Sequence, residues 1–201
     1  MLDVRHFIRV YDQTLDAALC RRIIDEFEAN PQGHQERSRV LEASPNQVTG
    51  RWIEMEAKGL AAADAIQAAL IERAKDYAGR YARDTGHSLF PFRLESFRIK
   101  RYDPTASGMF PPHVDVSSTA SMHRMLAVLW YLNDVEQGGD TWFGKIDVKV
   151  PPRQGRLLMF PPTFMYPHAG MPPKGRAKYI IGTYLSYASP HPAGANPTET
   201  A

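Results

Sequence analysis

The chain has 201 residues, of which 43% are hydrophobic and 23% are charged, and its formal net charge at pH 7 is +2. These fractions are typical of globular proteins and exclude general disorder or a fibrous architecture. The length suits one domain with a full hydrophobic core and is short for two. No run of Lys and Arg is long enough to form a dedicated nucleic-acid site, so a nucleic-acid substrate is disfavoured.

Cys20 is the only cysteine, which excludes an intrachain disulfide and a metal site built on pairs of thiolates. A metal would have to be held by histidine and carboxylate side chains. The opening letters MLDVRHFIRVYD lack the basic start and apolar stretch of a secretory signal, and no apolar run approaches the roughly 18 residues of a membrane span. We therefore expect a cytoplasmic protein without a membrane segment.

The first predicted elements are a short strand and a helix. HFIRVYD (residues 6–12) has the composition of a strand. Apolar residues at helical spacing then follow a helix cap at Thr14 or Asp16 and stop near Asn30. This pattern is typical of an amphipathic helix with one buried face.

A long loop and a long helix are expected next. Residues 33–50 are polar and show no sustained period, which predicts a loop that carries at most a short strand around Val40. The following stretch, LAAADAIQAALIERAKDYAGRYARDTG, is rich in good helix formers and ends at Gly86, a suitable helix terminus. A helix is the firmest expectation in this part of the chain.

After Gly86 the pattern changes to short strand-like runs separated by Gly, Pro and Asp clusters: FRLESFRIKRY, RMLAVLWYLND, GRLLMF, TFMYPH and AKYIIGTYLSY. Helices in front of many short strands predict a mainly β protein of the α+β class, with two packed sheets and the helices against one outer face. We expect one domain over residues 1–187, with a helical front at 13–86 and a barrel core at 91–187. Residues 188–201 are predicted to form a flexible tail.

A candidate metal-binding motif lies in FPPHVDVSS, where His113 and Asp115 are separated by one residue. Side chains two positions apart on an extended chain point to the same face, so these two can meet at one ion. An iron(II) site that leaves positions free for other ligands needs two histidines and one carboxylate. His168, beside a strand-like run further on, is the candidate for the third ligand. The other histidines are expected to be surface or packing residues: His6, His34, His87, His123 and His191.

The segments around these candidates resemble a known family. YLNDVEQGGDTWF (residues 131–143), PPRQGRLLMF and PHAGMPPKGRAKYIIGTYL resemble the prolyl 4-hydroxylase branch of the iron(II)- and 2-oxoglutarate-dependent dioxygenases. Members show H-x-D, a YLN strand, a GGxTxF turn, a distal histidine and a basic residue beyond it, all in this order. HFIRVYDQTLDAALCRRIIDEFE is similar to the family's first strand and helix. The resemblance covers most of residues 5–187 and implies a double-stranded β-helix, or jelly-roll barrel, buttressed by helices.

The resemblance also implies roles for individual residues. His113, Asp115 and His168 would be the iron ligands. Lys178, ten positions after His168, would pair with the distal carboxylate of 2-oxoglutarate (2OG), because a second carboxylate in a mostly apolar barrel needs a cation. Arg176 is the alternative for this role, because residues two positions apart on an extended strand point to the same face.

Three further residues match positions that line the cosubstrate pocket in the family. Tyr131 corresponds to a tyrosine that donates a hydrogen bond to the distal carboxylate of 2OG. Tyr102, in KRYDP, corresponds to a tyrosine of the same pocket, and Thr141 is a further candidate contact. Trp142 and Phe143 are expected to be packing residues.

The implied activity is the hydroxylation of a C–H bond, with Fe(II), 2OG and O2 as cofactor and cosubstrates, ascorbate as a reductant, and succinate and CO2 as products. The expected substrate is a prolyl or other residue of a peptide or protein, although no separate peptide-binding domain is predicted. Residues 103–112 and 33–50 are candidate mobile edges of the entrance. The alternatives are the same chemistry on a free amino acid or other small molecule, a non-catalytic metal-binding sensor, and an isomerase that uses its metal as a Lewis acid. The oligomeric state is left open.

Overall fold

A computed structural model describes residues 3–41 and 48–188. The helices are α1 (Ala17–Glu28) and α2 (Ala63–Thr85), with short 3-10 segments η1 (Val4–Phe7), η2 (Pro31–Gly33) and η3 (Ala57–Gly59). The strands are β1 (Arg9–Tyr11), β2 (Gln35–Leu41), β3 (Val48–Glu56), β4 (Phe92–Leu94), β5 (Arg98–Tyr102), β6 (Phe110–His113), β7 (Arg124–Tyr131), β8 (Gln137–Gly138), β9 (Thr141–Phe143), β10 (Val148–Val150), β11 (Leu157–Phe160), β12 (His168–Gly170), β13 (Pro173–Lys174) and β14 (Lys178–Tyr187).

Both predicted helices are confirmed, together with the residues that end them. The Asp16 carboxylate accepts a hydrogen bond from the Leu19 amide at 2.8 Å and so caps the first turn of α1. Gly86 follows α2 in the left-handed conformation, with φ +67°, which glycine adopts without a steric penalty. Each helix buries one face, at positions three or four residues apart: Cys20, Ile23 and Phe27 in α1, and Ile66, Leu70, Ala74, Ala78 and Tyr81 in α2.

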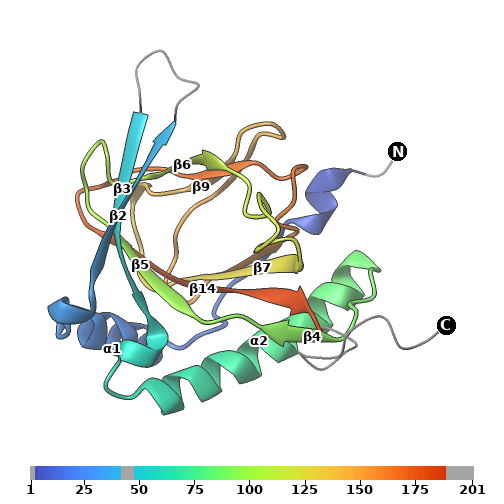
Figure 1. Cartoon of the computed structure of the whole chain (residues 1–201), viewed down its shortest axis with the longest axis horizontal. Helices are drawn as coiled ribbons and strands as arrows, with labels where there is room; N and C mark the ends of the chain where they lie inside the picture. Colours follow the sequence, from blue (N-terminus) through green and yellow to red (C-terminus); the bar gives the residue numbers. More distant parts are fainter. Residues whose placement is uncertain (1–2, 42–47, 189–201) are drawn as a thin grey trace.

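The strands form antiparallel sheets that face each other in a jelly roll, as predicted. The large sheet has the order β1-β11-β7-β14-β5-β3-β2, with β4 beside one end of β14. The smaller sheet has the order β10-β9-β12-β6. Figure 1 shows β6 and β9 on one side of the barrel and β5, β14 and β7 on the other. The space between the two sheets is where a site can be enclosed.

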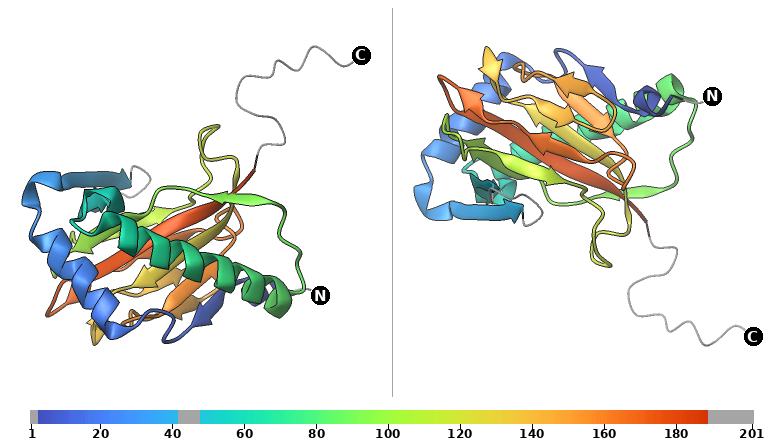
Figure 2. Two further views of the ribbon diagram at one scale, coloured as in Figure 1. Left: turned by 90° about the horizontal axis from the view of Figure 1, so that it is seen from below. Right: turned by 90° about the horizontal axis from the view of Figure 1, so that it is seen from above.

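The large sheet separates two hydrophobic cores, because successive side chains along each strand point to opposite faces of the sheet. In β7, the side chains of Leu126, Val128 and Trp130 pack with the helices, while those of Ala127 and Tyr131 face the smaller sheet. Figure 2 shows α1 and α2 crossing the outer face of the large sheet. The helices therefore buttress the barrel from one side and leave the space between the sheets to other side chains.

Three sequence-based expectations need correction. Residues 33–50 are not a long loop, because β2 and β3 pair as an antiparallel hairpin at the edge of the large sheet. TFMYPH is not a strand: a bend and turn at residues 163–165 leave Phe164 82% exposed, and β12 begins only at His168. Residues 6–12 contain the end of η1 and the three-residue strand β1. The predicted tail lies outside the described residues, except for position 188. Among the described helices, none is long and apolar enough to cross a membrane.

Candidate active site

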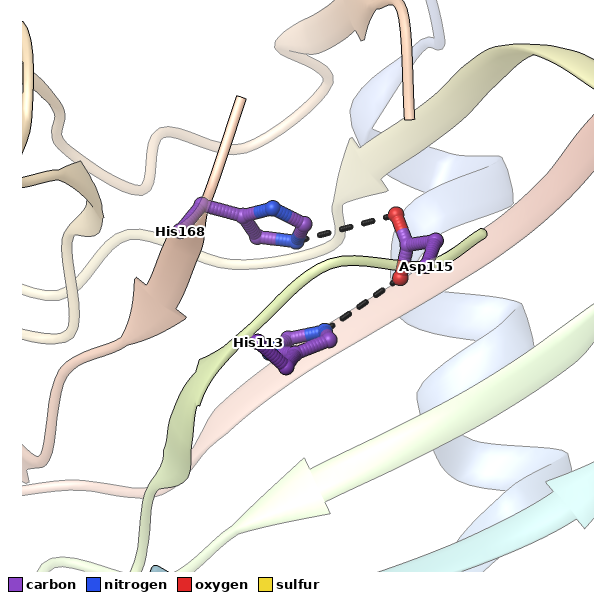
Figure 3. Close-up of side chains that lie close together, drawn as sticks. All are labelled: His113, Asp115 and His168. Atoms are coloured by element: carbon purple, nitrogen blue, oxygen red, sulfur yellow. Dashed lines mark ion pairs between the residues drawn. The ribbon is translucent and has the colours of Figure 1, made fainter. Parts of the chain in front are cut away.

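The three predicted metal ligands meet at one point between the sheets. His113 closes β6, His168 opens β12, and the two residues are direct partners in the antiparallel pairing of these strands. Asp115 lies at a bend two residues after His113. Its carboxylate oxygens are 3.2 Å from His113 Nε2 and 3.8 Å from His168 Nε2 (Figure 3). The bend, rather than alternation along a strand, turns Asp115 toward the imidazoles.

Hydrogen bonds on the far side of each ring define which nitrogen faces the centre. Nδ1–H of His113 donates to the carbonyl oxygen of Pro111 at 2.9 Å, and Nδ1–H of His168 donates to that of Tyr166 at 3.1 Å. This tautomer assignment follows from the carbonyl partners. It leaves both Nε2 lone pairs directed at Asp115, which is the orientation that backbone carbonyls commonly give to metal-binding histidines.

The charge state of the cluster also suits a metal. Burial lowers the pKa of His168 to about 4, so its ring is neutral at physiological pH. Burial alone would raise the pKa of Asp115, but the adjacent His113 and His168 outweigh that effect and hold it below its ordinary value. The carboxylate of Asp115 and the imidazoles of His113 and His168 have ligand atoms within 4.8 Å of one another, and they form the only such cluster among the described residues.

A cavity of about 840 Å³ extends from the ligands into the space between the sheets. Its lining includes the three metal-ligand candidates and, further in, Tyr102, Thr141 and Lys178. Tyr102 and Lys178 are direct partners across β5 and β14. The register of the large sheet therefore brings Tyr102 and Lys178 together at the cavity wall, which Thr141 of β9 also lines.

Lys178 is the buried cation of this end. Its side chain is 1% exposed, its ammonium group donates to the Gly139 carbonyl at 2.9 Å, and it lies 4.5 Å from the centre of the Tyr102 ring. Burial lowers the pKa of Lys178 to about 7. Arg176 is exposed and precedes β14. Because it is not part of the strand, the alternation that would put it on the same face as Lys178 does not apply. Of these two cations, only Lys178 lines the cavity.

Tyr131 lies behind Thr141 instead of lining the cavity. The Tyr131 hydroxyl donates to Thr141 Oγ1 at 2.7 Å and is completely buried. A threonine hydroxyl that accepts this bond keeps its own hydrogen for a partner on the cavity side. The two residues therefore form a relay in which Tyr131 orients Thr141.

Two predicted packing histidines bond to the backbone. His34 Nε2 is 2.9 Å from the carbonyl oxygen of Phe27, and His6 Nε2 is 3.3 Å from that of Thr85. His191 lies outside the described residues. No sequence motif marks Lys100, which lines the cavity together with the metal-ligand candidates. Strand alternation in FRIKRY, which puts Lys100 on the face of Tyr102, was the signal that could have found it.

Comparisons with known proteins agree with this geometry. Residues 97–186 match the model of the 2OG-Fe(II) oxygenase superfamily. A viral collagen prolyl hydroxylase of Paramecium Bursaria Chlorella virus-1, solved with 2OG, is 17% identical with TM-score 0.61, over 90% of this chain and 96% of that chain. A Trichoplax adhaerens prolyl hydroxylase solved with a peptide fragment of hypoxia inducible factor is 17% identical with TM-score 0.70, over 90% of this chain and 84% of that chain.

A prolyl-4-hydroxylase of Pseudomonas putida is 18% identical with TM-score 0.59, over 91% of this chain and 94% of that chain. At such low identities the solved structures establish the fold. No curated protein matches the sequence significantly.

Proposed function

We propose, from the match of residues 97–186 to the 2OG-Fe(II) oxygenase superfamily and from the prolyl 4-hydroxylase-like fold, that this chain is a 2OG-Fe(II) oxygenase that hydroxylates a prolyl or other residue of a peptide or protein. The observation that carries the proposal is the meeting of His113, Asp115 and His168 at the wall of a large cavity that also reaches Lys178. The Trichoplax adhaerens structure, solved with a peptide fragment, supports a peptide as the substrate.

The residues present fit an iron(II) ion. Two imidazoles and one carboxylate are the ligand set typical of non-haem iron oxygenases, because they occupy one side of the ion and leave positions for a cosubstrate and oxygen. The backbone carbonyls of Pro111 and Tyr166 already hold the rings in the metal-binding tautomer. His113, Asp115 and His168 would therefore hold the ion without a change of hydrogen bonding.

The far end of the same cavity fits the distal carboxylate of 2OG. Lys178 offers an ammonium group, and Thr141 offers a hydroxyl that Tyr131 orients. A carboxylate there would receive two hydrogen-bond donors in a site with little solvent, where charge-assisted bonds are strongest. Tyr102 covers Lys178 from one side through its ring. We propose Lys178 and Thr141 as the binding pair, with Tyr131 as a positioning residue.

When bound, Fe(II), 2OG and O2 supply an oxidant that inserts one oxygen atom into a C–H bond of the substrate and the other into succinate, with release of CO2. The chain supplies position and exclusion of water. Phe160, Phe143 and Phe110 pack around the imidazoles, with ring centres 4.7 Å from His168, 5.5 Å from His168 and 4.0 Å from His113 respectively. These rings keep the ligand side chains fixed and limit solvent at the reacting centre.

The test is succinate formation with a panel of peptides and free amino acids in the presence of Fe(II), 2OG and ascorbate. We expect at least one peptide to gain one oxygen atom by mass spectrometry, with succinate formed in equal amount, and Asp115→Ala to abolish both. Oxidation confined to a free amino acid would move the substrate assignment to small molecules. Succinate at background level with the whole panel would contradict an enzymatic function and favour a metal-binding sensor.

A further inference from the structure

A second lysine faces the cavity, and the proposed binding of iron and 2OG does not involve it. Lys100 lies in β5, directly opposite Glu54 of β3 and Ile180 of β14. Its ammonium group is 4.7 Å from the centre of the Phe110 ring and 5.7 Å from that of Trp52. The aromatic rings hold the side chain in place without using its three N–H donors.

Lys100 is also close to the metal ligands. The Phe110 ring on which its ammonium group rests is 4.0 Å from the ring of His113, centre to centre. Asp115 is among the charges that act on Lys100. The ammonium group is thus one aromatic ring away from the metal centre, within reach of a group attached near the reacting carbon of a substrate.

The Lys100 ammonium group makes no hydrogen bond or ion pair with any residue that the structure describes. The nearest candidate, Glu54, is already engaged: its carboxylate accepts bonds from Arg37 Nε at 3.0 Å, Trp52 Nε1 at 2.9 Å and Arg98 at 3.3 Å. A partly buried cation without a bonded partner is costly, and an anionic ligand would remove that cost.

The other carboxylate at the cavity wall is occupied in the same way. Glu95 accepts bonds from Arg124 Nε at 3.0 Å, from Arg124 Nη2 at 2.8 Å and from Ser186 at 2.6 Å. Seven cationic side chains line the cavity against three carboxylates, one of which is the metal ligand Asp115. The excess of positive charge favours an anionic substrate over a neutral or cationic one.

We propose that Lys100 binds a carboxylate of the substrate close to the carbon that is hydroxylated, so that the substrate is a carboxylate-bearing peptide residue or amino acid. This rests on the proposed function, because the carboxylate enters beside a metal site already filled by 2OG. The distal carboxylate of 2OG itself goes to Lys178, which is more deeply buried and shares its end of the cavity with Thr141.

The carboxylate has two possible sources, and matched probes separate them. N-acetyl-L-proline against N-acetyl-L-prolinamide, with the same pairs for other amino acids, tests a main-chain carboxylate. Acetyl-Pro-Asp-amide against acetyl-Pro-Asn-amide, and the reverse order of residues, tests an acidic neighbour in a peptide. Binding is measured by anaerobic calorimetry on protein loaded with Fe(II) and 2OG, which does not depend on turnover.

The variants are Lys100→Gln, Lys100→Met and Lys100→Arg, each checked for folding by its melting temperature and for 2OG binding. Lys149→Met is the matched control, because Lys149 is an exposed cation 6.0 Å from the Trp142 ring and does not line the cavity. We expect wild type and Lys149→Met to bind the carboxylate member of one pair about tenfold or more tightly than its amide. That ratio should fall to about one in Lys100→Gln and Lys100→Met, and be partly kept in Lys100→Arg.

Three results would overturn the role of Lys100. In the first, wild-type protein binds 2OG but binds neither member of any carboxylate–amide pair, or binds both members equally well. Another is a carboxylate preference that survives in Lys100→Gln. The third is loss of 2OG binding in Lys100→Gln with 2OG binding kept in Lys178→Gln, which would make Lys100 the cosubstrate ligand. Wild-type protein that binds no 2OG would instead refute the proposed function.

Discussion

At the scale of single residues, the chemistry depends on charges that the fold keeps out of water. Lys178 is the clearest case. Burial lowers its pKa to about 7, with Asp140 opposing and Lys100 reinforcing the effect, against about 10.4 in an unfolded chain. A lysine whose folded pKa is lowered destabilises the fold when protonated. The free energy of unfolding should therefore rise with pH between about 7 and 10.4, by the contribution of this group.

The same lysine makes 2OG binding pH-dependent. A carboxylate beside Lys178 favours its charged form, so above pH 7 binding takes up close to one proton and weakens by up to about tenfold per pH unit. Tyr102 stays neutral in this range, because burial raises its pKa. Calorimetry in buffers of different ionisation enthalpy measures the uptake. The arginine in Lys178→Arg stays charged throughout this pH range, so this variant should take up no proton when it binds 2OG. Equal proton uptake in wild type and Lys178→Arg would contradict the assignment of Lys178.

Tyr131 is predicted to act through Thr141. Tyr131→Phe removes the bond that orients the Thr141 hydroxyl while keeping the ring in the core, and should weaken 2OG binding about fivefold at a cost of about 1 kcal/mol in stability. Thr141→Val should weaken it at least as much, and the double variant should be no worse than Thr141→Val alone. Additive losses in 2OG affinity would show that Tyr131 contacts the cosubstrate independently.

At the scale of elements, the β2–β3 hairpin braces the strand that carries His113. A side-chain carbon at Gly50 would overlap the Pro111 ring of β6 and lie 2.5 Å from the carbonyl oxygen of Met109. The Arg51 amide also donates to the Ser107 carbonyl at 2.7 Å, in the loop before β6. The hairpin thus fixes the approach to the metal site through close backbone contact.

Gly50→Ala should push the hairpin away from β6, lower the melting temperature and weaken metal binding, because β6 ends at His113. Gly79→Ala is the control: Gly79 is exposed within α2 and has only a flexible Arg83 atom, at 3.6 Å, near the added carbon. That change should leave metal affinity unaltered and stabilise the helix by about 0.5–1 kcal/mol. Unchanged metal affinity in Gly50→Ala would refute the bracing role.

The hairpin also shows where sequence patterns fail. β2, QERSRVL, lies at the edge of the sheet, and its residues up to Val40 are exposed, so no apolar alternation marks it as a strand. The opposite error occurred at TFMYPH, where Phe164 and Met165 suggested a strand but remain exposed. Both failures arise because hydrophobic patterning reports burial, whereas β2 is paired without being buried and Phe164 and Met165 lie exposed in a turn.

The three metal-ligand candidates could be selected from the sequence because H-x-D and a distal histidine occur in a family's order, and the structure brings their side chains together. The functional role of Lys100 could not, since a lysine in a short strand has no motif, and its importance depends on Glu54 being engaged by other donors. Likewise, the position of Tyr131 behind Thr141 depends on the packing of β9 against the large sheet. Such relations between distant strands are set by tertiary structure.

At the scale of the whole molecule, the large sheet separates the hydrophobic core beneath the helices from the cavity that contains the candidate site. The core on its helix side contains Leu70, which is completely buried in α2, and none of the metal-ligand candidates. Leu70→Ala should reduce the free energy of unfolding by about 2–5 kcal/mol through the lost packing and the cavity left behind. Denaturant unfolding measures this loss, and 2OG affinity well below the unfolding transition should stay at the wild-type value. A parallel loss of 2OG affinity would show that the two sides of the sheet are coupled.

The central claim is that His113, Asp115 and His168 hold one ferrous ion that leaves room for 2OG. Anaerobic titration of the metal-free protein with Fe(II) and 2OG tests it most directly, through the weak visible charge-transfer band of the Fe(II)–2OG pair. We predict a band that saturates at one iron per chain in wild type and in Lys149→Met, and that is absent in His113→Ala and His168→Ala. A band of full intensity in His168→Ala, or no band in wild type, would contradict the account.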